Sequence, residues 1–106
     1  MTSNIYLVVH FNFPQPFQPE HGKKAWALHE AAVNCDWIEE VVAASGGVGM
    51  GPSCIWVFGL DNYAALDRLF HSDEAISKAY VDFFANMVDV QDMVREAVTF
   101  VSQAEA

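Results

Sequence analysis

The chain has 106 residues, a usual size for one domain, and we expect a single domain over residues 1–106. With 14 acidic residues against five basic ones the net charge is −9, so no basic patch can form to bind nucleic acid or an anionic membrane. Only 18% of the residues are charged while 53% are apolar, which favours burial of apolar surface between subunits.

The first predicted element is a strand from Ile5 to Phe13, because this segment is rich in β-branched and aromatic residues. Strand alternation places the apolar residues at odd positions on one face, which we expect to lie under helices. The other face mixes polar and apolar groups, namely Tyr6, Val8, His10 and Asn12. The segment lacks the basic start of a signal peptide and the long apolar run of a membrane span.

Three prolines between positions 14 and 19 predict a stiff loop after this strand. Strong helix formers from about Glu20 to Asn34 then predict a helix. Two further strands are predicted, from Trp37 to Ala44 and from Ser53 to Leu60, with the glycine-rich stretch 46–52 (GGVGMGP) between them.

The glycine-rich stretch does not match a phosphate-binding loop. A dinucleotide fingerprint needs glycines at relative positions zero, two and five before a helix. Counted from Gly47 the last position is Pro52, and counted from Gly49 it is Cys54; a strand follows, and no Gly-Lys-Ser/Thr ends the run. The stretch therefore predicts a hairpin connection or a bulged strand end, where glycine tolerates positive φ.

The second half of the chain predicts two helices and a strand. Asp61 or Asn62 caps a short helix, and Ser72 caps a longer one whose apolar stripe runs from Ile76 to Met87. A last strand is predicted over about Ala97 to Ser102. The order β-α-β-β-α-β predicts a ferredoxin-like α+β fold, an antiparallel sheet with both main helices on one face.

The sheet face without helices is predicted to carry Tyr6, Val8, His10 and Trp56 or its neighbours. This face is too apolar for water, so we expect two copies of the chain to bury it in a homodimer.

Residues 60–89, LDNYAALDRLFHSDEAISKAYVDFFANMVD, resemble the signature of the dimeric α+β barrel superfamily. In that signature a strand leads to a short helix, a joint (here residues 69–73) and an amphipathic helix ending in F-x-x-M-x-D. The element order is similar over nearly the whole chain, and the segment is most similar to the EthD-like and RedY-like branch, the latter from prodigiosin gene clusters. The resemblance implies a dimer that binds apolar or aromatic molecules between the open sheet face and the helices or loops.

Two better-defined activities of the superfamily are not carried over by this resemblance. Haem-degrading monooxygenases have their catalytic His and Trp at positions that correspond to about Ala79 and Leu69. Plant polyketide cyclases have a Tyr/His pair at positions that read Arg68 and Glu74 here.

His10 is the predicted catalytic residue, because a neutral imidazole in a desolvated pocket can act as a general acid or base. A histidine that is hydrogen-bonded across the dimer is an equal alternative. Tyr6 and Asn12 share its face and could orient a carbonyl or a pyrrole N–H, or could be ordinary strand residues.

Trp56 and Phe58 are predicted to supply a flat wall for an aromatic ligand, with core packing as the alternative. Tyr80 belongs to the helical stripe, and its hydroxyl is expected to reach the rim of the pocket. His29 is expected to face solvent and His71 to be a surface or capping residue.

No metal or cofactor is expected, because the four histidines show no paired spacing. Cys35 and Cys54 have no close partner, which favours two reduced thiols in a cytoplasmic protein.

Two functions of different classes follow from these features. The first is a cofactor-independent enzyme (a cyclase, isomerase or oxygenase type) or an enzyme accessory of secondary metabolism that acts on a pyrrole-like or aromatic intermediate, with a polyketide-cyclase-like or monooxygenase-like enzyme as an alternative. The second is a non-catalytic carrier of such an intermediate, which the few polar groups of the pocket favour. A purely structural dimer is a third interpretation.

Overall fold

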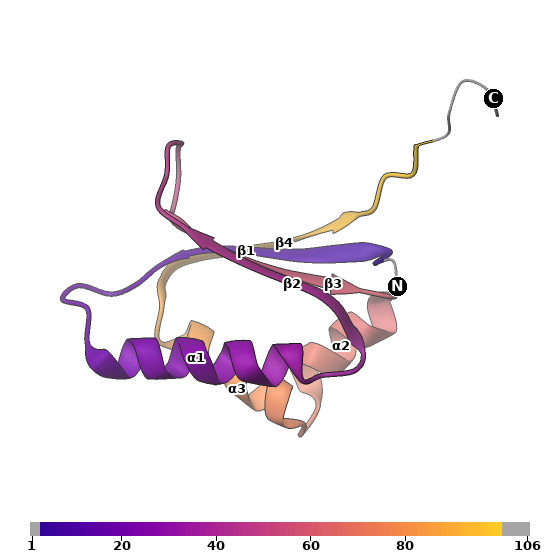
Figure 1. The fold of residues 1–106 in the computed structure, drawn as a ribbon, viewed down its shortest axis with the longest axis horizontal. Helices are drawn as coiled ribbons and strands as arrows, with labels where there is room; N and C mark the ends of the chain where they lie inside the picture. The colour runs from indigo at the N-terminus through magenta and orange to yellow at the C-terminus, as the bar shows by residue number, and fades with distance from the viewer. Residues whose placement is uncertain (1–2, 101–106) are drawn as a thin grey trace.

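The computed structural model describes residues 3–100 and contains one four-stranded antiparallel sheet in the order β2-β3-β1-β4. Its strands are β1 (Ile5–Asn12), β2 (Ile38–Ser45), β3 (Cys54–Leu60) and β4 (Val88–Glu96). The helices α1 (Pro19–Val33), α2 (Tyr63–His71) and α3 (Ala75–Ala85) all lie on one side of the sheet (Figure 1). The predicted ferredoxin-like arrangement is confirmed.

The alternation predicted for the first strand is present in β1, where buried and half-buried residues follow one another along the whole strand. Its buried residues Leu7 and Val9 lie opposite Phe58 and Trp56 of β3. Directly paired residues of antiparallel strands point to the same face. The apolar sides of β1 and β3 therefore form one surface, and the helices cover it with residues such as Phe83 of α3.

Of Trp56 and its neighbours, Ile55 and Val57 are the ones that lie on the open face, whereas Trp56 is only 4% exposed and faces the helices. The segment CIWVFGL is apolar throughout apart from its glycine, so alternation carries no information about its faces. The register against β1 decides them, because Trp56 is paired with Val9.

The prediction of the last strand was wrong. Strand β4 begins at Val88, directly after α3, and pairs with β1 from Asn12 opposite Val88 to Ile5 opposite Glu96. Residues 97–100 form no strand, and residues 101–102 of the predicted segment lie outside the described residues. Pairing with a buried central strand outweighs the weak local preference of the charged segment VDVQDMVRE.

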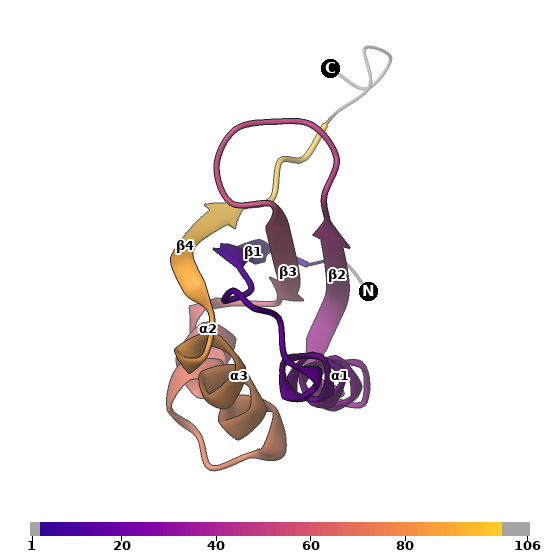
Figure 2. The ribbon, with the colours of Figure 1, turned by 90° about the vertical axis from the view of Figure 1, so that its left-hand side faces the viewer.

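The glycine-rich stretch forms the predicted hairpin connection between β2 and β3. The Gly46 N–H donates to the Ser53 carbonyl at 3.0 Å, and Gly46 has a φ of 78°, which suits glycine. The side chains of Val48 and Met50 at its tip are fully exposed. Figure 2 shows this hairpin rising beyond the sheet, on the side away from the helices.

Of the two predicted caps of the first short helix, Asn62 is the one present. Its side-chain oxygen accepts a hydrogen bond from the Ala65 N–H at 2.9 Å at the start of α2. The prediction of Ser72 as the cap of the longer helix was wrong. Ser72 is the C-cap of α2, and Glu74 holds the N-cap position of α3; the Ser72 hydroxyl accepts a hydrogen bond from the Glu74 backbone N–H.

Candidate functional site

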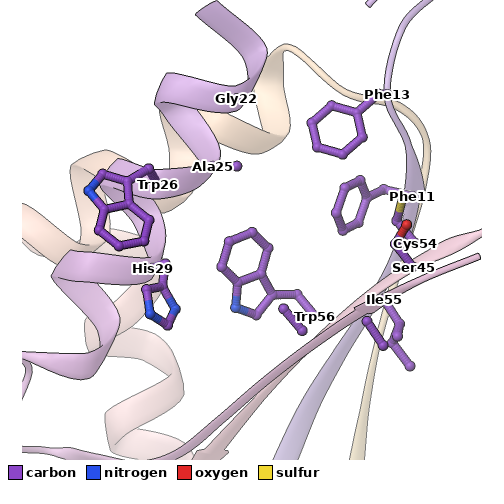
Figure 3. A pocket seen from close by; sticks show the side chains of 12 residues that line it. Phe11, Phe13, Gly22, Ala25, Trp26, His29, Ser45, Cys54, Ile55 and Trp56 are labelled. Carbon is purple, nitrogen blue, oxygen red and sulfur yellow. The ribbon is translucent and has the colours of Figure 1, made fainter. Parts of the chain in front are cut away.

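A pocket of about 520 Å³ lies between α1 and the sheet, beside the ends of β2 and β3 that lead into the hairpin (Figure 3). Small residues make the space, because Gly22 and Ala25 of α1 face Ala43 of β2, which is paired with Trp56, across it. Larger side chains in these positions would fill the gap. Phe11, Phe13 and Trp56 form aromatic walls, and Trp26 of α1 lies at the mouth, 62% exposed.

The ring of Trp56 forms one wall of this pocket and carries a polar atom, the indole Nε1. It packs against Phe11 at a centroid distance of 6.5 Å and against Phe58 at 6.0 Å, with both pairs stacked. Its indole Nε1 is buried, and among residues 3–100 no acceptor lies within hydrogen-bond distance. The pocket wall therefore holds a donor that is not satisfied.

His29 also lines the pocket, although the sequence predicts that it faces solvent. It is half-buried rather than solvent-facing, and its ring lies 5.5 Å from that of Trp26. The helical period carried the missing signal, because Gly22, Ala25, Trp26 and His29 follow at spacings of three and four and so share one face of α1.

A second, more polar cavity of about 660 Å³ adjoins the first and shares Phe13, Ser45 and Cys54 with it. Asn12, predicted to orient a ligand, lies in its wall but already has partners. Its amide oxygen accepts from the Ser53 N–H at 3.0 Å, and its amide nitrogen donates to Asp89 at 3.2 Å. In this state Asn12 ties the start of β3 to the start of β4.

His10, the predicted catalytic residue, lies on the open sheet face between Ile55 and Gln91. It is half-buried and lines neither of the two adjoining cavities. Its roles as acid or base, or as a hydrogen-bonding group across a dimer, stay predictions.

Tyr6 lies on the same open face and is engaged in a small network. Its hydroxyl donates to Glu40 at 3.0 Å, and the buried Ser3 hydroxyl donates to the same carboxylate oxygen at 2.7 Å. The bond to Glu40 raises the pKa of the Tyr6 phenol, and the bonds from Ser3 and Tyr6 lower the pKa of Glu40. Tyr6 therefore serves as a donor at neutral pH, not as a base.

Phe58 and Tyr80 lie in the core next to the pocket and do not line it. Phe58 is fully buried, and its ring lies 5.7 Å from that of Tyr80. Burial, with a smaller contribution from the charge of Asp92, raises the pKa of Tyr80, so its phenol stays protonated. As ligand-binding residues both stay predictions.

Arg68 and Glu74, which occupy the positions of the cyclase Tyr/His pair, bind each other. Two guanidinium nitrogens donate to the two carboxylate oxygens, and the guanidinium lies 4.5 Å above the ring of Trp37. The Trp37 indole also donates to Glu74 at 3.2 Å. This cluster joins the α1–β2 connection to the α2–α3 joint and leaves neither charged group free for acid–base chemistry. His71 is exposed and pairs with Asp67 on the same helix.

Within residues 3–100, no three His, Cys, Asp or Glu side chains are grouped so that they could hold a metal ion. None of the three helices combines the length and the apolar character needed to cross a membrane.

No family model matches the chain, and no curated protein matches it. Solved structures do. A DABB family protein with a ferredoxin-like fold from Mesorhizobium loti has a TM-score of 0.72 at 9% identity, over 92% of this chain and 100% of that one. A dimeric ferredoxin-like protein of unknown function from Thermobifida fusca has a TM-score of 0.71 at 13% identity, over 92% of this chain and 93% of that one. The chain has a ferredoxin-like fold.

The hydroxynitrile lyase of Passiflora edulis is also similar, with a TM-score of 0.70 at 11% identity, over 96% of this chain and all of that one. At such identities the similarity shows the fold alone, because one fold supports unrelated activities.

Proposed function

We propose that the pocket between α1 and the sheet binds a flat, apolar small molecule, and that the protein is a binding protein rather than an enzyme. The observation that carries this proposal is the pocket of about 520 Å³ with aromatic walls from Phe11, Phe13 and Trp56. Ligand sites are typically concave, mostly apolar and equipped with few polar groups.

The charges around the pocket favour an uncharged ligand. No lysine or arginine is among the residues that line it, and the chain has a net charge of −9. An anion transferred into this pocket would lose its hydration without gaining a counter-ion. A neutral aromatic compound pays no such cost.

The few reactive groups in the pocket favour binding over catalysis. His29 and Cys54 are the titratable side chains of its lining, and His29 has no hydrogen-bonded partner to orient it within the described part of the chain. Proton transfer and nucleophilic catalysis generally use a base held by a further group. We therefore propose a carrier or shelter for its ligand.

Filling the pocket is expected to weaken this binding. Figure 3 shows Ala25 pointing into the pocket, so the side chain of Ala25→Leu would occupy ligand space. Displacing about 60 Å² of ligand surface from the wall costs about 1.5 kcal/mol, so the affinity for N-phenyl-1-naphthylamine should fall about tenfold or more. The Kd is measured from the rise in fluorescence of this neutral dye.

Ala27→Leu is the matched control, since Ala27 lies on the same helix but is exposed. It should bind the dye like the unaltered protein. Equal affinity in Ala25→Leu, or no binding of the dye to the unaltered protein, would contradict a ligand site in this pocket.

We further propose that the open sheet face pairs with a second copy of the chain. Val8, Val42, Val57 and Met93 lie together there by their register, and no helix covers them. Similar structures from Thermobifida fusca and Bacteroides fragilis are described as dimeric. Two such faces packed together would remove the apolar side chains from water.

A charge on this face is expected to break the dimer. Val42 on the open face and Val81 on α3 are almost equally exposed, at 53% and 54%. In Val42→Glu two carboxylates would be buried near one another, so the dissociation constant should rise at least about a hundredfold, the effect of about 2.7 kcal/mol. The dissociation constant is measured by light scattering coupled to gel filtration over a range of protein concentrations. The control Val81→Glu should stay dimeric. A dimer that Val42→Glu does not weaken would place the interface elsewhere.

The narrower assignments stay predictions. The EthD-like and RedY-like branch and a prodigiosin-type bipyrrole or polyketide pathway are predicted from residues 60–89, and a cytoplasmic location is predicted from Cys35 and Cys54. A carrier of a flat aromatic intermediate is compatible with such a pathway, and the neutral apolar pocket is the feature that supports it.

A further inference from the structure

The pocket holds one buried hydrogen-bond donor without a partner, the indole Nε1–H of Trp56. Buried polar groups in folded proteins are nearly always paired, and an unpaired one lowers stability. Among residues 3–100 this is the one buried side-chain nitrogen or oxygen without an acceptor or donor. Such a position needs an explanation, and a bound molecule is one.

The other two indoles of the chain are not in this state. The Trp37 N–H donates to Glu74 at 3.2 Å, and Trp26 is 62% exposed, so water can serve it. The contrast is informative, because Phe58 and Phe83 pack beside Trp56 without any polar atom. A phenylalanine could fill the same layer. The indole N–H lowers the stability of the fold unless another group accepts its hydrogen bond.

The direction of the N–H places the missing acceptor on the α1 side of the ring. Figure 3 shows the indole nitrogen on the edge of Trp56 that is turned toward His29. No hydrogen bond holds the His29 imidazole within the described residues, and it is only half-buried. A movement of this ring would open the N–H to a ligand atom in the pocket.

We infer that the ligand of this pocket is a flat aromatic compound with a neutral carbonyl oxygen, which accepts the hydrogen bond of Trp56 Nε1. This rests on the proposed function and narrows its ligand class. A carbonyl suits the site better than a carboxylate, because no basic side chain lines the pocket to balance a charge. Trp56 then selects among apolar molecules of similar size.

Two probes of nearly the same shape test the inference, 2-acetonaphthone and 2-isopropenylnaphthalene, which differ by C=O against C=CH₂. Each is titrated as a competitor of N-phenyl-1-naphthylamine. The ketone should bind about fivefold more tightly, the effect of a net hydrogen bond of about 1 kcal/mol. In Trp56→Phe the ratio of the two affinities should fall to about one, and in His29→Phe it should persist.

A nuclear magnetic resonance experiment on the unaltered protein does not depend on a variant that folds. The ¹H–¹⁵N spectrum should contain three indole signals, one for each tryptophan. The ketone should move the Trp56 signal downfield, as expected for a new hydrogen bond, and the hydrocarbon should not. The Trp37 signal is an internal control, because the Trp37 N–H already donates a hydrogen bond to Glu74.

Separate results would overturn the two proposals. If the dye does not bind, or binds equally to Ala25→Leu, both proposals fail. If the dye binds in the pocket but the ketone does not displace it, the proposed function stands and the inference about the carbonyl ligand fails. If both displace it with equal affinity and the Trp56 signal does not respond to the ketone, the pocket binds apolar molecules but Trp56 does not select them. A preference that survives Trp56→Phe or disappears in His29→Phe would assign the selection to another group.

Discussion

Replacement of Phe58 by alanine is expected to lower the free energy of unfolding by about 3–5 kcal/mol. Phe58 is fully buried at the centre of β3, where its ring is stacked on Trp56 at 6.0 Å and meets Tyr80 edge-on at 5.7 Å. Removing the ring would leave a cavity that the surrounding rigid aromatic layer cannot close. The sequence predicts Phe58 as a ligand wall with core packing as the alternative, and the loss of stability would identify its main role as core packing.

The free energy is measured by urea unfolding at one fixed protein concentration, since dimerisation would contribute to it. Phe17→Ala is the matched control, because Phe17 is 53% exposed in the loop before α1. Its loss should cost about 1 kcal/mol, mainly from its contact with Phe13. A Phe58→Ala protein as stable as Phe17→Ala would contradict the assignment of Phe58 to the core.

Gly59→Ala is expected to destabilise the protein by about 1–3 kcal/mol, the usual cost of overpacking. A Cβ atom at this position would lie 2.1 Å from the Ser3 hydroxyl oxygen and 2.9 Å from the Glu40 Cβ. Gly59 lies between Tyr6 and Glu40 in the sheet, so the absence of its side chain makes room for Ser3 to donate to Glu40. The substitution should also disturb the hydrogen bond from Tyr6.

A double-mutant cycle separates the steric clash with Ser3 from any general effect of placing alanine instead of glycine in a strand. Ser3→Gly removes two of the three clashing atoms, including the closest one, and leaves the contact with the Glu40 Cβ, so Gly59→Ala should cost less in the Ser3→Gly background. Gly22→Ala is the control in α1, because the new Cβ would meet only Phe17, at an ordinary contact distance of 3.6 Å. This substitution should stabilise the helix by about 0.5–1 kcal/mol. Additive costs of Ser3→Gly and Gly59→Ala would contradict the steric account.

The two sides of the sheet have different uses in this protein. The helix-covered side holds the core and, at the hairpin end, the pocket to which we assign ligand binding. The open side holds His10, Tyr6 and the valines to which we assign pairing of two copies. His10 and Trp56 are only one position apart in the register, since His10 faces Ile55, but they point to opposite sides of the sheet. A catalytic His10 and a ligand beside Trp56 therefore belong to different compartments.

The sequence by itself determined the elements whose pattern is local. The alternation of Ile5 to Asn12, the helical stripe that begins at Ile76 and a cap at Asp61 or Asn62 each depend on residues a few positions apart. All three are present in the structure, which selects Asn62 as the cap. The ferredoxin-like order follows from these elements, because short connections and right-handed crossovers leave few other arrangements.

Only the tertiary structure decided the features that depend on partners distant in the chain. The residues of β3 are nearly all apolar, so pairing with β1 determined which side Trp56 faces. The start of β4 at Val88 likewise depends on β1, because its own charged sequence has little strand preference. The pocket arises where small residues of α1 cross small residues of β2, and this meeting of Ala25 and Ala43 is a property of packing that no local pattern contains.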